Sequence, residues 1–182
     1  LHMSFQLSYL FTNHMILQRD KRIAVFGTGK TGSKVTVSLL DDNEDVVTSS
    51  AKVPMTVTGV ITDSKFLLYL PPLSAGGPYT LRVTDGSETL EYYDVLLGDL
   101  WFAGGQSNME LPVKRTLDLY RDEVRKTNEP MIRSFQLLKE PMFGEQREMP
   151  EEGEWIAADA QTVMEFSAVG FFFAQMKQAE DG

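Results

Sequence analysis

Short segments in which hydrophobic and polar residues alternate follow one another along the first half of the chain. In residues 34–40, valine and leucine alternate with lysine, threonine and serine, which is the period of a half-buried β-strand. Similar short segments follow at residues 66–70, 79–83 and 90–92. Turn-forming pairs such as Pro71-Pro72 and Asp85-Gly86 separate them. This spacing predicts an antiparallel, jelly-roll-like β-sandwich over residues 1–97.

The pattern changes after Asp94. Val95–Leu97 and Leu100–Ala103 are apolar without interruption, as in strands that are buried on both faces. Residues 117, 120 and 124 are apolar at helical spacing within a charged segment, and Pro130–Phe135 has the character of a strand. This order of elements predicts the start of an α/β domain over residues 98–182.

A further helix is predicted close to the end of the chain. Thr162 and Glu165 have the spacing of a capping box, and apolar residues occupy most faces of the helix that follows, from Phe166 to Phe173. We therefore expect this helix to be buried most of the way round. Two strands and two helices with such faces cannot cover themselves, so we expect an incomplete domain that self-associates or aggregates.

Composition removes several classes of function. The 182 residues carry a formal net charge of -9, and without a basic surface the chain is not expected to bind nucleic acid. It has no cysteine and two histidines, so we predict neither a disulfide nor a metal site, and no cofactor. No apolar run approaches the roughly 20 residues that span a bilayer.

The N-terminus, Leu1-His2-Met3, lacks the pattern of a signal peptide. We interpret this opening as a remnant of an expression vector, which is compatible with the earlier removal of an export signal. The absence of a signal is weak evidence about the compartment, and a periplasmic or secreted location is slightly favoured.

Residues 24–31 fit a relaxed phosphate-loop pattern, with Ala24 where the first glycine often stands. A phosphate loop needs a strand before it and a helix after it, because the helix N-terminus helps to hold the phosphates. Here an alternating segment follows at residues 34–40. The context predicts a strand–turn–strand hairpin, and nucleotide binding is not expected.

Two glycines and a serine follow the apolar run Leu100–Ala103. Gly104 and Gly105 allow a sharp turn, and a serine on such a turn can expose its hydroxyl as a nucleophile. The alternative is an ordinary turn, because glycine, serine and asparagine are common in turns. A nucleophilic serine also needs a general base and donors for an oxyanion. His14 is a candidate base, although its apolar neighbours are more typical of a structural histidine.

Residues 98–101 (Gly-Asp-Leu-Trp) and 104–110 (Gly-Gly-Gln-Ser-Asn-Met-Glu) closely resemble the first signature block of sialate O-acetylesterase-like proteins, which are carbohydrate esterases of the SGNH hydrolase superfamily. Further segments resemble the same family in the same order, namely residues 15–20, 26–27, 70–79 and 166–174. The resemblance covers nearly the whole chain.

This resemblance implies a flavodoxin-like SGNH hydrolase domain after the β-sandwich, and a serine esterase that removes acetyl groups from sugars without a metal. It implies that Ser107 is the nucleophile and that its own backbone amide is one oxyanion donor. Gly105, Gln106 and Asn108 would support the oxyanion or the substrate. The family's base, a histidine supported by an aspartate, belongs to later blocks that this chain lacks. Leu111 departs from the family, where an aromatic residue is frequent.

The leading hypothesis is therefore the N-terminal portion of a serine-dependent carbohydrate O-acetylesterase, with an O-acetylated carbohydrate as substrate, that is inactive or nearly so by itself. Two alternatives stay open. The β-sandwich could be a carbohydrate-binding or structural module, since Tyr9, Tyr69, Tyr92 and Tyr93 are scattered through it. Or the remaining part of the hydrolase domain could be a second polypeptide, as in a two-chain esterase.

Overall fold

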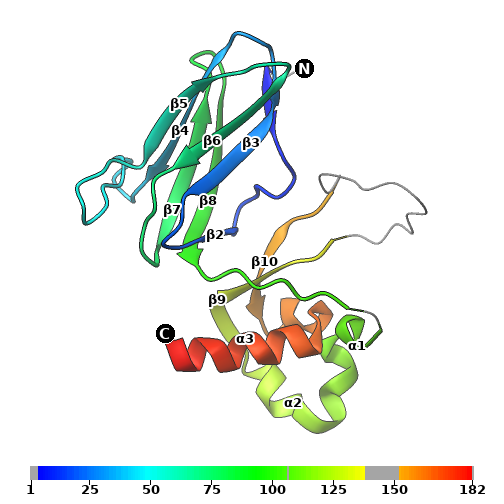
Figure 1. Ribbon diagram of the computed structural model, residues 1–182. Helices are drawn as coiled ribbons and strands as arrows, with labels where there is room; N and C mark the ends of the chain where they lie inside the picture. Colours follow the sequence, from blue (N-terminus) through cyan, green and yellow to red (C-terminus); the bar gives the residue numbers. More distant parts are fainter. Residues whose placement is uncertain (1–3, 106, 138–151, 182) are drawn as a thin grey trace. The chain divides into compact units, whose positions relative to one another are not determined.

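The computed structural model describes residues 4–105, 107–137 and 152–181 (Figure 1). These residues form two compact units. The first contains the chain up to Leu100 and the described residues between Gln136 and Glu154, and the second contains Trp101–Phe135 and the chain from Trp155 onward. Each unit is described by itself.

The first unit consists of β-strands in two sheets. A three-stranded antiparallel sheet has the order β1 (Phe5–Leu7), β3 (Ile23–Gly29), β6 (Lys65–Leu70). A five-stranded sheet has the order β2 (Ile16–Gln18), β8 (Thr89–Gly98), β7 (Gly76–Thr84), β4 (Lys34–Leu40), β5 (Thr56–Val60). The prediction of a β-rich first half is confirmed.

The five-stranded sheet is mixed, so the prediction of purely antiparallel pairing is wrong at its edge. Strand β2 runs parallel to β8, with Ile16 opposite Leu96. The chain leaves β2 for the other sheet and reaches β8 only much later, and this long connection allows the parallel pairing.

Alternation along the strands gives each sheet one buried face. Val35, Val37 and Leu39 of β4 have no exposed surface, whereas Lys34 is exposed. On β7, Leu81 and Val83 are also fully buried, and they lie opposite Leu39 and Val37 in the register. Each such side chain contributes about 1.5–3 kcal/mol through burial, so the period-2 pattern identified both the strands and their buried side.

The segment with the relaxed phosphate-loop pattern lies mostly within β3, and the next element is β4 and not a helix. The predicted hairpin is wrong, because β3 and β4 belong to different sheets. The turn at residues 30–33 carries the chain from one sheet to the other. A phosphate site was not expected because the segment needs a helix after it. The structure has strand β4 at that place.

Gly27 lies where β1 and β3 approach closely. A Cβ atom at this position would overlap the backbone carbonyl oxygen of Gln6, and a backbone atom in a sheet cannot move away without breaking the strand pairing. We expect Gly27→Ala to lower the free energy of unfolding by about 1–3 kcal/mol, measured by urea denaturation. Gly98→Ala is the matched control, because the nearest atom to its added Cβ lies at 3.5 Å. Equal stability of the two variants would contradict the assigned pairing.

Asp85 closes the turn between β7 and β8. Its Oδ1 accepts hydrogen bonds from the backbone N–H groups of Ser87 (2.9 Å) and Glu88 (2.8 Å), and its Oδ2 accepts one from the hydroxyl of Ser4. The Ser4 hydroxyl is the largest cause of a lowered pKa of the Asp85 carboxyl, followed by the amide of Glu88. These bonds connect the start of the chain to this turn.

The lowered pKa predicts how stability depends on pH. A carboxyl whose pKa is lower in the folded state contributes stability above its unfolded pKa, about 3.9, and loses that contribution as the pH falls towards the folded pKa. We expect Asp85→Asn to lower the urea midpoint at pH 7. Below about pH 4, the midpoints of the variant and of the parent chain should approach each other. Asp42→Asn, on an exposed turn, should leave the midpoint unchanged at both pH values. A loss of stability for Asp85→Asn that does not vary with pH would contradict the assignment.

The second unit combines helices with a small sheet. Its helical elements are α1 (Ser107–Glu110), the 3₁₀ helix η1 (Val113–Thr116), α2 (Leu117–Arg125), the 3₁₀ helix η2 (Thr162–Glu165) and α3 (Ala168–Asp181). Its strands β9 (Asn128–Phe135) and β10 (Trp155–Asp159) pair antiparallel. The core of this unit consists of Val113, Val124, Ile132, Ala158, Val163, Phe166, Ala168 and Phe171.

Strand β9 and helix α2 were predicted, and Val124 is buried as expected. Other predictions for this unit are wrong. Residues 100–103 form no strand, and β10 was not among the predicted elements. Glu165 does not close a capping box, since its carboxylate accepts hydrogen bonds from Nζ of Lys114 at 2.8 and 3.0 Å.

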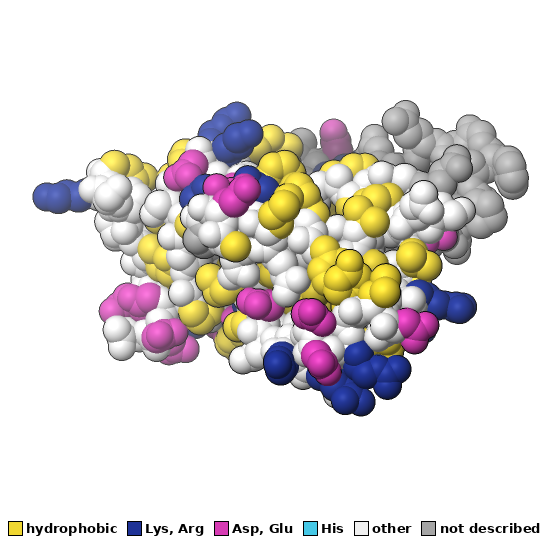
Figure 2. Space-filling view, turned by 90° about the horizontal axis from the view of Figure 1, so that it is seen from below, with side chains coloured by type: hydrophobic (Ala, Val, Ile, Leu, Met, Phe, Trp, Pro, Cys, Tyr) yellow, Lys and Arg dark blue, Asp and Glu magenta, His cyan; other side chains and the backbone are white. Residues whose placement is uncertain are grey.

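Helix α3 is less buried than predicted. Only Ala168 and Phe171 are buried, while Val169, Phe173 and Met176 are 50%, 36% and 55% exposed. A helix that is buried all round needs neighbours on every side, and the described elements of this unit cover one side. Figure 2 shows hydrophobic side chains gathered on one face of the molecule, with charged side chains around them.

Candidate active site

Ser107 is the first residue of the short helix α1 and is exposed. The residues before it, Trp101–Gly105, have no regular secondary structure. Sequence reasoning expected a buried strand leading into the turn, and this part of the expected site is not formed. The observed arrangement is an extended apolar segment, two glycines and a helix start.

The segment after α1 is fixed to the chain that precedes α3. The backbone N–H of Ala168 donates to the carbonyl of Leu111 at 2.8 Å, and that of Val113 donates to the carbonyl of Phe166 at 2.9 Å. Because residues 166 and 168 belong to the core of the unit, these bonds anchor the chain on the C-terminal side of Ser107.

An aromatic contact anchors the chain on the N-terminal side of Ser107. The rings of Trp101 and Phe173 meet edge to face, with centroids 5.2 Å apart, although Trp101 is 61% exposed. Phe102, the next residue, is 90% exposed. No sequence pattern indicated the Trp101–Phe173 contact, because the two residues lie far apart in the chain and have only aromatic character in common.

The two glycines before the serine leave space for neighbouring side chains. A Cβ atom on Gly104 would lie 2.6 Å from the ring of Phe102, and one on Gly105 would lie 2.5 Å from Cγ of Met109. Met109 is in α1, so Gly105 lets the chain turn closely against the helix that carries Ser107. Asn108 is exposed beside Ser107 in the same helix, and Gln106 lies outside the described residues.

Among the described residues, no general base is bonded to Ser107. Its hydroxyl makes no hydrogen bond with a described residue, and residues 101–182 contain no histidine. His14 belongs to the first unit, where its Nδ1 lies 2.6 Å from Oδ2 of Asp94. Both residues of this pair have positive φ angles, 66° and 54°, and the backbone N–H of His14 donates to the carbonyl of Tyr93 at 3.0 Å. These bonds attach the turn at His14 to strand β8.

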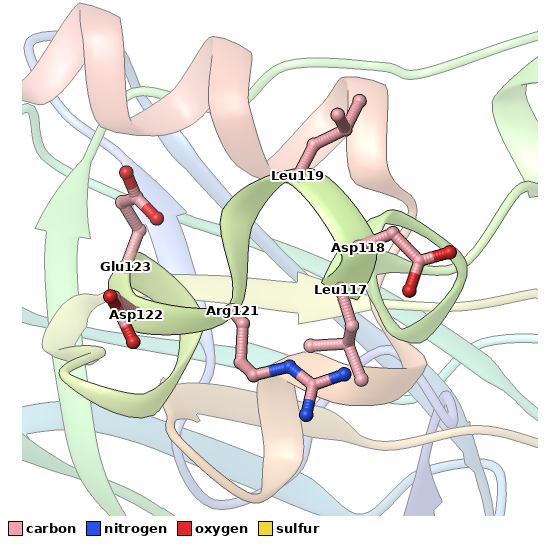
Figure 3. Close-up of a pocket in the computed structure, with 6 residues that line it drawn as sticks. All are labelled: Leu117, Asp118, Leu119, Arg121, Asp122 and Glu123. Atoms are coloured by element: carbon pink, nitrogen blue, oxygen red, sulfur yellow. The ribbon is translucent and has the colours of Figure 1, made fainter.

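A shallow hollow of about 410 Å³ lies beside α2. Its lining residues, Leu117, Asp118, Leu119, Arg121, Asp122 and Glu123, all come from this helix, and Figure 3 shows their side chains spread to different sides of it. The hollow includes no residue of the Gly104–Glu110 segment. Within the described part of the chain, no group of His, Cys, Asp or Glu residues could hold a metal ion, and no helix is long and apolar enough to cross a membrane.

Comparison with known proteins gives consistent relatives. The chain is 33% identical over 116 residues to rat sialate O-acetylesterase and 32% identical over 124 residues to the human protein. These alignments cover 60% and 65% of the chain, but only 20% and 22% of the two relatives. No family model matches the chain.

A solved structure matches more of the chain. A carbohydrate acetylesterase from Xanthomonas citri superimposes with a TM-score of 0.85 and 32% sequence identity, over 98% of this chain and 38% of that protein. The chain is thus a relative of carbohydrate acetylesterases. Among these it is sialate O-acetylesterase-like, which confirms the resemblance seen in the sequence. It spans about a fifth of the length of the sialate O-acetylesterases that it matches.

Proposed function

We propose that this chain is part of a serine-dependent carbohydrate O-acetylesterase in which Ser107 is the nucleophile. The observation that carries the proposal is the position of Ser107, exposed at the first residue of α1 and two positions after Gly105. Similarity to esterases that act on acetylated sugars supports it. Residues 1–97 would be a sandwich-type β-domain and residues 98–182 the first part of an SGNH-type hydrolase domain.

The proposed reaction is acyl transfer in two steps. The Ser107 oxygen attacks the carbonyl carbon of the acetyl ester while its proton passes to a base, and the resulting oxyanion accepts hydrogen bonds. The carbon–oxygen bond to the sugar then breaks, the sugar oxygen takes up a proton, and acetyl-serine remains. Water attacks this ester and releases acetate. Backbone amides near Ser107, with Gly105, Gln106 and Asn108 around them, would stabilise the oxyanion or the substrate.

The base would come from outside this chain. The resemblance implies a histidine supported by an aspartate, and residues 101–182 contain no histidine. The exposed apolar side chains of the second unit, including Phe102, Val169 and Met176, would contact the rest of the hydrolase domain in a complete enzyme. Without that part, self-association through the same surface is the expected behaviour.

Acetate release tests this function. A protein that extends this chain to the length of its relatives should release acetate from 9-O-acetyl-N-acetylneuraminic acid or from acetylated xylo-oligosaccharide, as followed by proton NMR. The 182-residue chain alone should release almost none, because Ser107 has no base. Absence of release from either sugar by the extended protein would contradict the esterase assignment, and rapid release by the short chain would contradict the incomplete site.

A further inference from the structure

The three-stranded sheet of the first unit has an outward face that is apolar and basic. In β3 and β6 the residues Ile23, Val25, Phe66 and Leu70 are buried, so alternate positions point the other way. The outward positions pair across the sheet as Ala24 with Tyr69, Phe26 with Leu67 and Thr28 with Lys65. Strands β3 and β6 lie side by side in Figure 1.

Two large side chains on this face are open to solvent. Leu67 is 53% exposed and Tyr69 is 41% exposed. Ala24, opposite Tyr69 in the register, is small and leaves the tyrosine ring accessible from that side. Leu67 and Tyr69 therefore form an apolar surface on the sheet. The pairing of β6 with β3 fixes the backbone that carries these side chains.

Arg22 lies at one end of this surface, one residue before β3. Its guanidinium carbon is 4.5 Å from the centroid of the Tyr69 ring, and a cation at this distance over an aromatic face is held by the ring's quadrupole. Arg22 forms no hydrogen bond or ion pair with a described residue. By contrast, Arg19 pairs with Asp99 at 3.1 Å and Arg82 with Glu91 at 2.6 Å. The N–H donors of the Arg22 guanidinium are therefore available to a ligand.

The charge of this face differs from that of the chain as a whole. The chain has 26 acidic and 17 basic residues, yet β1, β3 and β6 contain no aspartate or glutamate. Lys65 adds a second cation at an outward position of β6. The three strands thus contribute one cation, Lys65, and no acidic side chain to this face, and Arg22 adds a cation one residue before β3.

We propose that the outward face of β1, β3 and β6 binds a carboxylate-bearing oligosaccharide. The guanidinium fork of Arg22 matches the two oxygens of a carboxylate. One face of a sugar ring carries C–H groups, and their burial against Tyr69 and Leu67 removes apolar surface from water. This binding site belongs to the first unit, whereas Ser107 belongs to the second. The choice of a carbohydrate as carrier of the carboxylate rests on the proposed esterase function.

Anionic polymers and membranes fit this face less well. Nucleic acids and acidic lipid surfaces are bound by many cations together, whereas this face has two on a chain with a net charge of -9. A short glycan with one carboxylate needs only a local cation and an apolar support, and both are present here.

Titration of the 182-residue chain with 3′-sialyllactose, trigalacturonic acid and lactose, followed by NMR chemical shifts, tests the proposal. We expect at least one acidic sugar to bind at residues 22, 67 and 69 and lactose to bind at least about tenfold more weakly. Arg22→Ala should weaken the acidic sugar about tenfold, and Arg22→Lys should recover part of the loss, because lysine keeps the charge but not the fork. Arg115→Ala removes the same charge from an exposed position of the second unit and should change nothing.

Several outcomes would overturn the proposal. These are no binding of either acidic sugar, equal binding of lactose, or the same loss in Arg115→Ala as in Arg22→Ala. Binding to phosphatidylserine vesicles that requires Arg22, without sugar binding, would assign the face to lipid. The titration does not depend on hydrolysis, so it tests the glycan-binding site independently of the esterase. If the extended protein releases acetate but the chain binds neither acidic sugar, only the glycan-binding site is overturned. Sugar binding without acetate release would instead contradict only the esterase assignment.

Discussion

Replacing Ser107 with alanine is expected to lower the rate of acetate release by the extended enzyme by about a thousandfold or more, as found when a catalytic serine is removed from other hydrolases. Alanine has no oxygen to attack the acetyl carbonyl, so no acetyl-enzyme can form. The exposed position of Ser107 in α1 means that the lost hydroxyl supports no packing, and the fold should be preserved.

The measurement is kcat/KM for an O-acetylated sugar, together with mass spectrometry of the enzyme during turnover. The parent enzyme should carry one acetyl group on the peptide that contains Ser107, and the Ser107→Ala enzyme should carry none. Ser50→Ala, at an exposed position of the first unit, should keep full activity. Activity that survives the loss of Ser107 would assign the nucleophile to another residue.

Phe171→Ala is expected to lower the free energy of unfolding of the second unit by about 3–5 kcal/mol, the usual cost of removing a buried phenylalanine ring. Phe171 is 3% exposed, and its ring centroid lies 5.5 Å from that of Phe172 and 6.3 Å from that of Phe166. Such a loss is comparable with the whole stability of a small domain. The second unit should therefore unfold while the first stays folded.

The two tryptophans make this result measurable, because Trp101 and Trp155 both belong to the second unit. Tryptophan fluorescence should show a much lower denaturation midpoint in Phe171→Ala, while the β-sheet signal in circular dichroism keeps its own midpoint. Phe102 is 90% exposed. Phe102→Ala should therefore change the free energy of unfolding of either unit by no more than about 0.5 kcal/mol. An equal shift of both signals would show that the chain unfolds as one cooperative unit.

The sequence predicted elements well where one face of the element is buried. The alternation at residues 34–40 became β4, with Val35, Val37 and Leu39 fully buried. Helix α2 buries Val124 as its spacing indicated, although Tyr120 of the same predicted face is 42% exposed. In these cases one residue pattern, repeated over several positions, states both the type of element and its inner face.

Predictions failed where partners decide the structure. Leu100–Ala103 has the composition of a buried strand, but a strand needs neighbours for its backbone hydrogen bonds, and none of the described strands pairs with it. Thr162 and Glu165 have the spacing of a capping box, but the carboxylate of Glu165 lies with Lys114, 51 positions away. Composition and spacing do not show such distant partners.

The sequence by itself predicted strands β4, β6, β7 and β8 of the first unit and the sialate O-acetylesterase-like resemblance, because each depends on residues that are close together in the chain. Only the tertiary structure decided that β2 runs parallel to β8, that Trp101 contacts Phe173, and that Arg22 lies over Tyr69 on a sheet whose three strands contain no acidic residue. These features join segments that are distant in the chain. They depend on how the sheets and helices pack, which no local pattern of residues contains.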